Sequence, residues 1–121
     1  MADENKLLFD VTDPRGYRVT LSNDQYQNHI ISMVDHNAHN EFTPDEIQEC
    51  VERPEIIYQS ENIPTRDLYF GRSSVTYPDM FLRTVVAMDE TEKTGEVVTA
   101  HLTKRLSGGK ELKYVNYKSE L

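Results

Sequence analysis

The four histidines of this sequence have the side chains best suited to proton transfer at neutral pH. Three of them, His29, His36 and His39, lie within QNHIISMVDHNAHN, and the fourth, His101, lies in GEVVTAHLTK. Histidine titrates near neutrality, so it can act as a base or an acid. Cleavage of an RNA phosphodiester without a metal needs a base, an acid and donors for the phosphate charge. These residue types therefore permit that chemistry.

The helical spacing of the first cluster separates a pair from a bystander. His29 and His36 are seven residues apart, so on a helix they differ in direction by about 20°. They lie at the border of an apolar stripe, and His39 points into solvent. The stripe consists of Tyr26, Ile30, Met33 and Val34. His29 and His36 are thus candidate catalytic residues, and ordinary boundary side chains are the alternative.

A zinc site is a further interpretation of His36 and His39, whose spacing of three residues occurs in metal sites. Zinc needs three or four ligands, and this segment contains neither a cysteine nor an HExxH arrangement. We therefore expect no metal and no cofactor.

The strand-like run 95–104 places a histidine among hydroxyls. Alternation directs one set of side chains to the core and the other to the opposite face. The core set is Val98, Ala100 and Leu102, and the opposite set is Val97, Thr99, His101 and Thr103. We predict Thr99 and His101 as catalytic residues and Thr103 as a binding residue. An exposed strand histidine with no function is the alternative.

Candidate phosphate and base contacts come from two other stretches. Tyr69 and Arg72 lie in DLYFGR, and Lys104 and Arg105 follow the His101 strand. Arginine and lysine neutralise phosphate, and tyrosine offers a stacking surface for an unpaired base. The predicted roles are catalysis for Arg72 and substrate binding for Tyr69, Lys104 and Arg105.

The overall charge is −8, which argues against a broad grip on nucleic acid. The last 21 residues nevertheless hold five positive and two negative side chains, against 8 and 19 in the first 100. A local anion-binding strip and a lysine-protected edge strand both fit this asymmetry.

Length and composition predict a single domain over residues 1–121. No apolar run is long enough to span a membrane, and the acidic N-terminus does not resemble a secretory signal, so we expect a cytoplasmic protein. The lone Cys50 is predicted to be small core filler on a helix.

Two helices are predicted to follow an N-terminal hairpin or arm. A turn at Asp13-Pro14-Arg15-Gly16 joins two alternating runs within residues 6–21. Ser22 or Asn23 can cap a first helix, which ends near 37–40. Thr43-Pro44 begins a second helix that ends at Arg53-Pro54.

After Pro54 the period changes to two, which is typical of strands. The predicted strands are 55–61, 66–72, 80–89 and 95–104, with one more hairpin through Gly108-Gly109 into LKYVNY. Short connections favour an antiparallel meander. The expected fold class is therefore α+β: the hairpin or arm at residues 1–21, two helices, then an antiparallel sheet of four to five strands.

The order of these motifs resembles a known nuclease superfamily. NHI followed by His36, TPDEI and ERPEII, the Tyr69 strand, TVVAM and VVTAHLTK are similar to prophage-borne members of the barnase/EndoU/colicin/RelE-like (BECR) superfamily. The resemblance covers residues 22–118, which would form the nuclease-like core. It implies a barnase-like fold.

The resemblance also implies an activity: a metal-independent endoribonuclease, often a prophage toxin or effector, with RNA as substrate and a cognate immunity or antitoxin protein as partner. His101 and His29 would exchange protons, while Arg72, Thr99 and Tyr69 would hold the phosphate or base. A different class of function stays open. The chain could be a non-catalytic phage accessory or antitoxin-like interaction module that docks a basic partner through its acidic surface.

Overall fold

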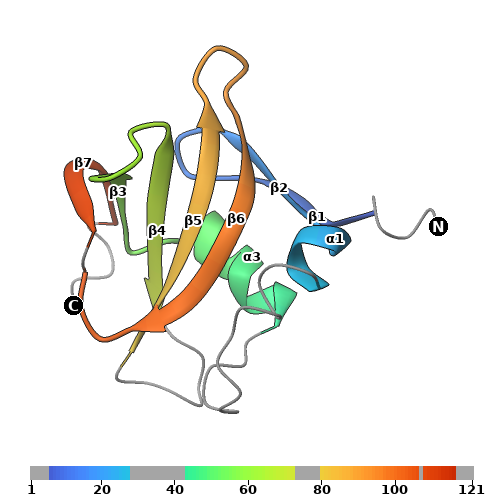
Figure 1. Ribbon diagram of the computed structural model, residues 1–121, viewed down its shortest axis with the longest axis horizontal. Coiled ribbons are helices and arrows are strands. Elements are labelled where there is room, and N and C mark those ends of the chain that lie inside the picture. Colours follow the sequence, from blue (N-terminus) through green and yellow to red (C-terminus); the bar gives the residue numbers. More distant parts are fainter. Residues whose placement is uncertain (1–5, 28–42, 73–79, 107, 117–121) are drawn as a thin grey trace.

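A computed structural model describes residues 6–27, 43–72, 80–106 and 108–116. These residues form one seven-stranded sheet in the order β1-β2-β6-β5-β4-β3-β7 (Figure 1). In the chain they run β1 (Leu7–Thr12), β2 (Arg18–Ser22), α1 (Asn23–Gln25), α3 (Pro44–Glu52), β3 (Ile56–Ser60), β4 (Arg66–Arg72), β5 (Phe81–Asp89), β6 (Thr94–Thr103) and β7 (Gly109–Val115). Helix α3 lies behind the sheet in Figure 1.

The expected α+β class, with its barnase-like arrangement of two helices before an antiparallel sheet of four to five strands, is wrong. The described residues hold seven strands in one mixed sheet and two short helices. The N-terminal hairpin of β1 and β2 is part of the sheet, because β2 pairs in parallel with β6 from Arg18↔Thr94 to Thr20↔Glu96. This pairing joins segments more than seventy residues apart, so local periodicity cannot predict it. The expected first helix is described only at its start, as α1.

The final strand also differs from the expectation. The hairpin through Gly108-Gly109 was expected to place the last strand beside β6, but β7 pairs with β3 on the other side of the sheet. An ideal Cβ at Gly108 would lie 3.1 Å from Arg83 Nη1 and 3.4 Å from Leu68 Cδ1. The connection from β6 to β7 therefore passes over side chains of β5 and β4.

Helix α3 begins where the sequence predicts, at a capping box formed by Thr43 and Glu46 with Pro44 in the first turn. Its buried residues Ile47, Cys50 and Val51 pack against β1, β4 and β5. Gly71 allows close approach, since a Cβ there would lie 3.1 Å from Cys50 Sγ. The confirmed core position of Cys50 makes its thiol inert, because burial raises its pKa to about 12.

Alternation along the central strands defines two faces of the sheet. The helix face, covered by α3, carries the fully buried Tyr69, Thr84 and Val86. The outer face carries the cross-strand row Phe70, Arg83 and His101. Figure 1 looks onto the outer face.

A β-bulge reverses the alternation within β6. The β5–β6 register shifts between Val85 and Val86, so Val97 and Ala100, three residues apart, are both buried in the core. The prediction that Val97 shares a face with His101 is therefore wrong. Gln25 of α1 donates a hydrogen bond to the carbonyl of Val98 at this bulge, with an N–O distance of 2.5 Å.

Candidate functional site

The outer face of β5 and β6 brings a histidine and an arginine into direct contact. Arg83 Nε donates a hydrogen bond to His101 Nε2 at 2.6 Å. The two residues are direct cross-strand partners, and both side chains are half-buried. Because Nε2 accepts this bond, the imidazole is neutral with its proton on Nδ1, a tautomer assigned from the bond itself.

The surroundings of His101 favour its neutral form. Burial, with a further contribution from the positive charge of Arg83, lowers the pKa of His101 from 6.5 to about 4. Burial likewise lowers the pKa of Arg83. At neutral pH the imidazole therefore lacks the second ring proton that a general acid would give up, and its one lone pair, on Nε2, is already engaged. In this arrangement it cannot exchange protons with a substrate.

The β-bulge decides that Arg83 and His101 meet. Extending the Met88↔Gly95 register along the strands would place Arg83 opposite Ala100 and would turn His101 toward the helix face. The extra residue in β6 instead places His101 opposite Arg83 on the outer face. The sequence analysis did not identify Arg83 for this reason. The alternation of FLRTVV predicts only that Arg83 points to the other face of its strand from Leu82 and Thr84.

Three other predicted residues share the outer face with this pair. Thr99, His101 and Thr103 alternate along β6 opposite Val85, Arg83 and Phe81, and Arg72 of β4 lies opposite Phe81. Such neighbours lie within about 5–7 Å of one another across or along strands. The structure therefore places Arg72, Thr99, His101 and Thr103 on one sheet face, with Arg72 and Thr99 two strands apart and about 13 Å apart along the strand direction.

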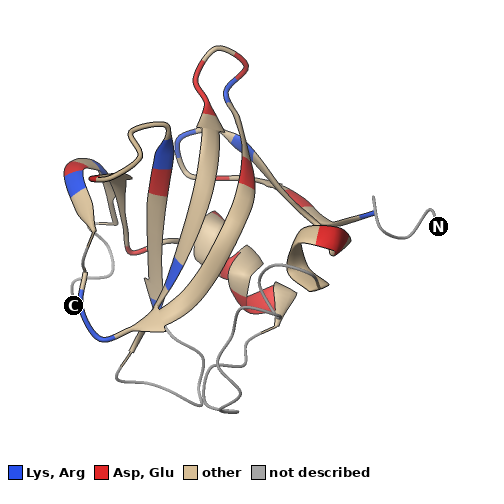
Figure 2. Ribbon diagram, in the orientation of Figure 1, with Lys and Arg blue, Asp and Glu red and all other residues tan. Residues whose placement is uncertain are grey.

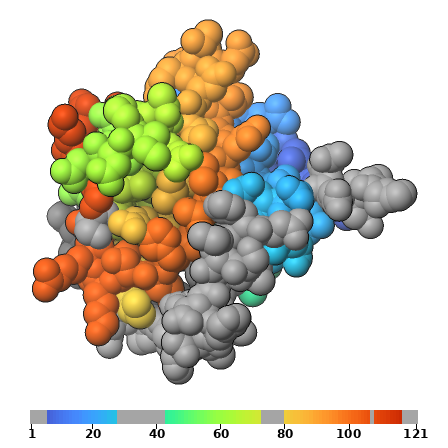
Figure 3. Space-filling model, in the orientation of Figure 1, coloured from blue at the N-terminus to red at the C-terminus, as the bar shows by residue number. Residues whose placement is uncertain are grey.

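Two of the predicted binding residues follow directly from β6. The Thr103 hydroxyl accepts a hydrogen bond from Arg105 N at 3.3 Å and donates to Arg105 O at 3.0 Å. This turn leaves Lys104 and Arg105 exposed. Figure 2 colours the Lys and Arg positions blue where the chain leaves β6, and Figure 3 shows this orange segment projecting from the surface.

The side chain of Arg72 is held only weakly by its ion pair with Glu55. Its side chain is 70% exposed, and its Nε lies 3.8 Å from Glu55 Oε2. An exposed ion pair at that distance contributes little. Arg72 can therefore turn toward an anion on the outer face at small cost. We define the outer-face cluster as Arg72, Arg83, Thr99, His101, Thr103, Lys104 and Arg105.

The structure separates Tyr69 from this cluster. Tyr69 lies on the helix face with 0% of its surface exposed. Its hydroxyl donates to Asp13 Oδ2 at 2.6 Å and accepts from Arg15 Nη2 at 2.9 Å. The prediction that Tyr69 stacks on a base beside His101 is corrected accordingly, because the ring faces the core.

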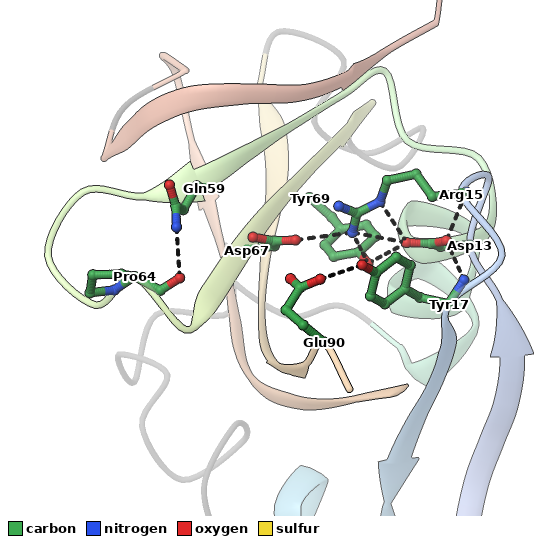
Figure 4. Close-up of polar contacts among 8 residues, drawn as sticks. All are labelled: Asp13, Arg15, Tyr17, Gln59, Pro64, Asp67, Tyr69 and Glu90. Carbon is green, nitrogen blue, oxygen red and sulfur yellow. Dashed lines mark hydrogen bonds and ion pairs between the residues drawn. The ribbon is translucent and has the colours of Figure 1, made fainter. Parts of the chain in front are cut away.

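Tyr69 belongs instead to a buried polar network that we call the hairpin clamp: Asp13, Arg15, Asp67 and Tyr69 (Figure 4). Asp13 Oδ1 accepts hydrogen bonds from the backbone N–H groups of Arg15 and Tyr17, at 2.8 and 2.9 Å. Arg15 Nη2 lies 3.1 Å from Asp13 and 3.0 Å from Asp67. The clamp thus fixes the turn between β1 and β2 to β4.

Donors are scarce inside the clamp. Two protons of Arg15 Nη2 serve three nearby oxygens, and Asp67 Oδ2 is close enough for an ion pair but has no aligned hydrogen bond. Burial raises the pKa of Asp67 despite the opposing charge of Arg15. Burial alone would lower the pKa of Arg15, but electrostatic interactions with Tyr69 and Asp13 raise it. Because the carboxylates, the guanidinium and the phenol contact one another, these interactions fix the β1–β2 turn to β4, which is a structural role.

The rim of the clamp is more open. The Arg15 guanidinium carbon lies 4.6 Å from the centroid of the Tyr17 ring, and Lys93 Nζ lies 5.9 Å from the same centroid. The Tyr17 hydroxyl donates a hydrogen bond to Glu90 in the β5–β6 turn. These contacts attach the N-terminal hairpin to a second loop.

His29, His36 and His39 lie outside the described residues, so the pairing of His29 and His36 with His101 stays a prediction. Within the described part of the chain, no three or more His, Cys, Asp or Glu side chains are grouped to hold a metal ion. No helix in those same residues is long and apolar enough to cross a membrane.

Comparisons with family models, curated proteins and solved structures found no match.

Proposed function

We propose that this chain is a metal-independent endoribonuclease-like domain that binds and cleaves RNA at the outer-face cluster. The observation that carries the proposal is the placement of His101 beside Arg83, in line with Thr99 and Thr103, on one sheet face. Lys104 and Arg105 adjoin this row in a chain whose net charge is −8. A local concentration of cations and hydroxyls in an acidic protein favours binding of a phosphate there.

Each residue has a role in this proposal. Arg72, Arg83, Lys104 and Arg105 neutralise the phosphate, and guanidinium groups can also bind it with two parallel hydrogen bonds. Thr99 supplies a hydroxyl donor, while the Thr103 hydroxyl, whose proton is donated to Arg105 O, holds the turn that presents Lys104 and Arg105. His101 transfers a proton once its lone pair is released, and His29, with His36 near it in sequence, supplies the second proton-transfer group.

The biological setting is part of the same proposal and is supported by the motif resemblance alone. The chain would be a prophage toxin or effector acting in the cytoplasm, restrained by a cognate immunity or antitoxin protein.

An RNA cleavage assay in EDTA tests the activity. We expect wild type to cleave single-stranded or structured RNA, and His101→Ala and His29→Ala each to lose most of this activity, by about 10²–10⁴-fold for loss of an acid–base group. Arg66→Gln is the matched control. Phe70 is the β4 residue level with Arg83 and His101, and Arg66 lies four residues before it, about 13 Å along the strand. Folded wild type that cleaves no RNA would overturn the proposal.

A non-catalytic interaction module is the second candidate. It is favoured by the acidic side chains on α3, where Asp45 and Glu49 are exposed and Glu46 and Glu52 are half-exposed (Figure 2, red on α3). A basic protein partner would dock on these acids. Under this candidate, wild type and His101→Ala would be equally inactive on RNA, and Glu49→Lys would weaken partner binding.

A further inference from the structure

The contact between Arg83 and His101 is built into the sheet. The two residues are cross-strand partners, and Arg83 Nε meets His101 Nε2 at 2.6 Å. Gly108 lies over the guanidinium, since an ideal Cβ there would be 3.1 Å from Nη1. The arginine is therefore held between β6 and the β6–β7 connection.

This contact conflicts with proton transfer by His101. A neutral imidazole has one lone pair, and here that lone pair accepts a bond from a cation. A proton can reach Nε2 only when the guanidinium withdraws, and the protonated ring is then favoured only if negative charge has arrived nearby.

We propose that a phosphate group binding beside Arg83 draws the guanidinium away from His101 and thereby allows the imidazole to take up a proton from solvent. This inference rests on the proposed function, because it assigns the outer-face cluster a substrate-controlled switch. The ligand class is a phosphate, either a free ion or a phosphodiester. The proton adds to the freed Nε2, and no bond to the phosphate is formed or broken.

The neighbouring groups fit a phosphate in particular. A guanidinium can present two parallel N–H groups to two oxygens of a phosphate, whereas it meets the imidazole through a single bond. Thr99 and Thr103 flank His101 on the same face, and the exposed Lys104 and Arg105 follow. Arg72 and Phe70 are the nearest residues of β4 on this face.

Among the described charged groups, Arg83 is the one that shifts the titration of His101. Its withdrawal and the arrival of an anion therefore act in the same direction. Both raise the affinity of the imidazole for a proton.

Titration of the histidine ring resonances by NMR tests the switch, with His101 assigned by comparison with His101→Gln. Without ligand the pKa should be about 4. Saturating inorganic phosphate, compared with chloride at equal ionic strength, should raise it by at least one unit, a tenfold gain in proton affinity. A DNA oligonucleotide, which lacks the 2′-hydroxyl needed for cleavage, tests the phosphodiester separately.

Two variants make the result specific to the pair. Arg83→Gln should raise the pKa of His101 without phosphate and abolish the response to it, while Arg66→Gln should behave as wild type. Linkage adds a second measurement: wild type should bind phosphate more tightly as the pH falls toward 4, and His101→Gln should lack this dependence.

The switch would be overturned if the pKa of His101 stayed unchanged with both inorganic phosphate and the DNA oligonucleotide, or if neither compound bound. RNA cleavage with an unchanged pKa would remove the switch and leave the proposed function. A shifted pKa without RNA cleavage would keep the switch and remove the nuclease.

Discussion

At the scale of residues, burial decides what each charged side chain contributes. Two arginines of the same hairpin show this. Arg15 is 16% exposed and faces two buried carboxylates, whereas Arg18 is 62% exposed and pairs with Asp10 at the surface. Burial removes the competing water, so a missing partner leaves an uncompensated charge only in the first case.

We therefore expect Arg15→Met to lower the free energy of unfolding by about 3–5 kcal/mol, the usual cost of leaving buried charges without a partner. Arg18→Met is the matched control and should change stability little. Urea unfolding at pH 7 measures both. Equal losses in the two variants would show that the hairpin clamp is not a buried ionic network.

The depressed pKa of His101 predicts a dependence of stability on pH. Its pKa is about 4 in the folded chain and 6.5 in the unfolded chain, so between these values the unfolded state binds more protons. Stability should therefore rise with pH from 4 to 6.5 and level off above, by less than the ~1.4 kcal/mol per pH unit allowed for one proton.

His101→Gln should remove this slope and leave the contributions of the other titrating groups. Urea unfolding of both proteins at several pH values gives the difference directly. A difference that stays constant between pH 4 and 6.5 would mean that His101 keeps its ordinary pKa in the folded state.

At the scale of elements, close backbone approach attaches β7 to the sheet. Gly109 lies opposite Ser60 of β3, and an ideal Cβ there would lie 2.4 Å from Tyr58 Cβ. A real Cβ does not approach another side chain so closely, so any larger residue must displace the strand.

Gly109→Ala should cost about 1–3 kcal/mol through overpacking. It should also increase hydrogen exchange in the backbone amides of β7. Lys110→Ala, at the exposed neighbouring position, is the control and should retain the exchange rates of the wild type. Unchanged protection of β7 in the glycine variant would contradict the close contact with Tyr58.

At the scale of the whole molecule, a net charge of −8 opposes the approach of RNA, while the outer-face cluster attracts it locally. Binding of single-stranded nucleic acid weakens with salt by about 0.7 logarithmic units per phosphate contact. Four cations, Arg72, Arg83, Lys104 and Arg105, set an upper limit of about 3 for that slope. Salt also screens the repulsion by the acidic remainder, which reduces the slope further.

Replacing Lys104 and Arg105 together by glutamine should reduce the salt slope of RNA binding by about 1.4 and should weaken binding at low salt. Fluorescence anisotropy over a range of salt concentrations measures both quantities, with Arg66→Gln as control. A double variant that retains the wild-type slope would place the RNA away from the outer-face cluster.

Local patterns in the sequence were enough to predict individual elements. Alternation gave the bounds of β4, Arg66–Arg72, and the Thr43-Pro44 pair gave the start of α3, because periodicity and capping depend on residues a few positions apart. It also placed Thr99 and His101 on one strand and Cys50 in the core.

How the elements meet depends on long-range contacts that local patterns do not reveal. The parallel pairing of β2 with β6, the position of β7 beside β3 and the burial of Tyr69 depend on contacts between residues distant in sequence. The bulge in β6 is the sharpest case: one extra residue exchanges the two faces of the strand and brings His101 to Arg83. Alternation alone cannot reveal it, because a slip of a single residue leaves the local pattern of residue types unchanged.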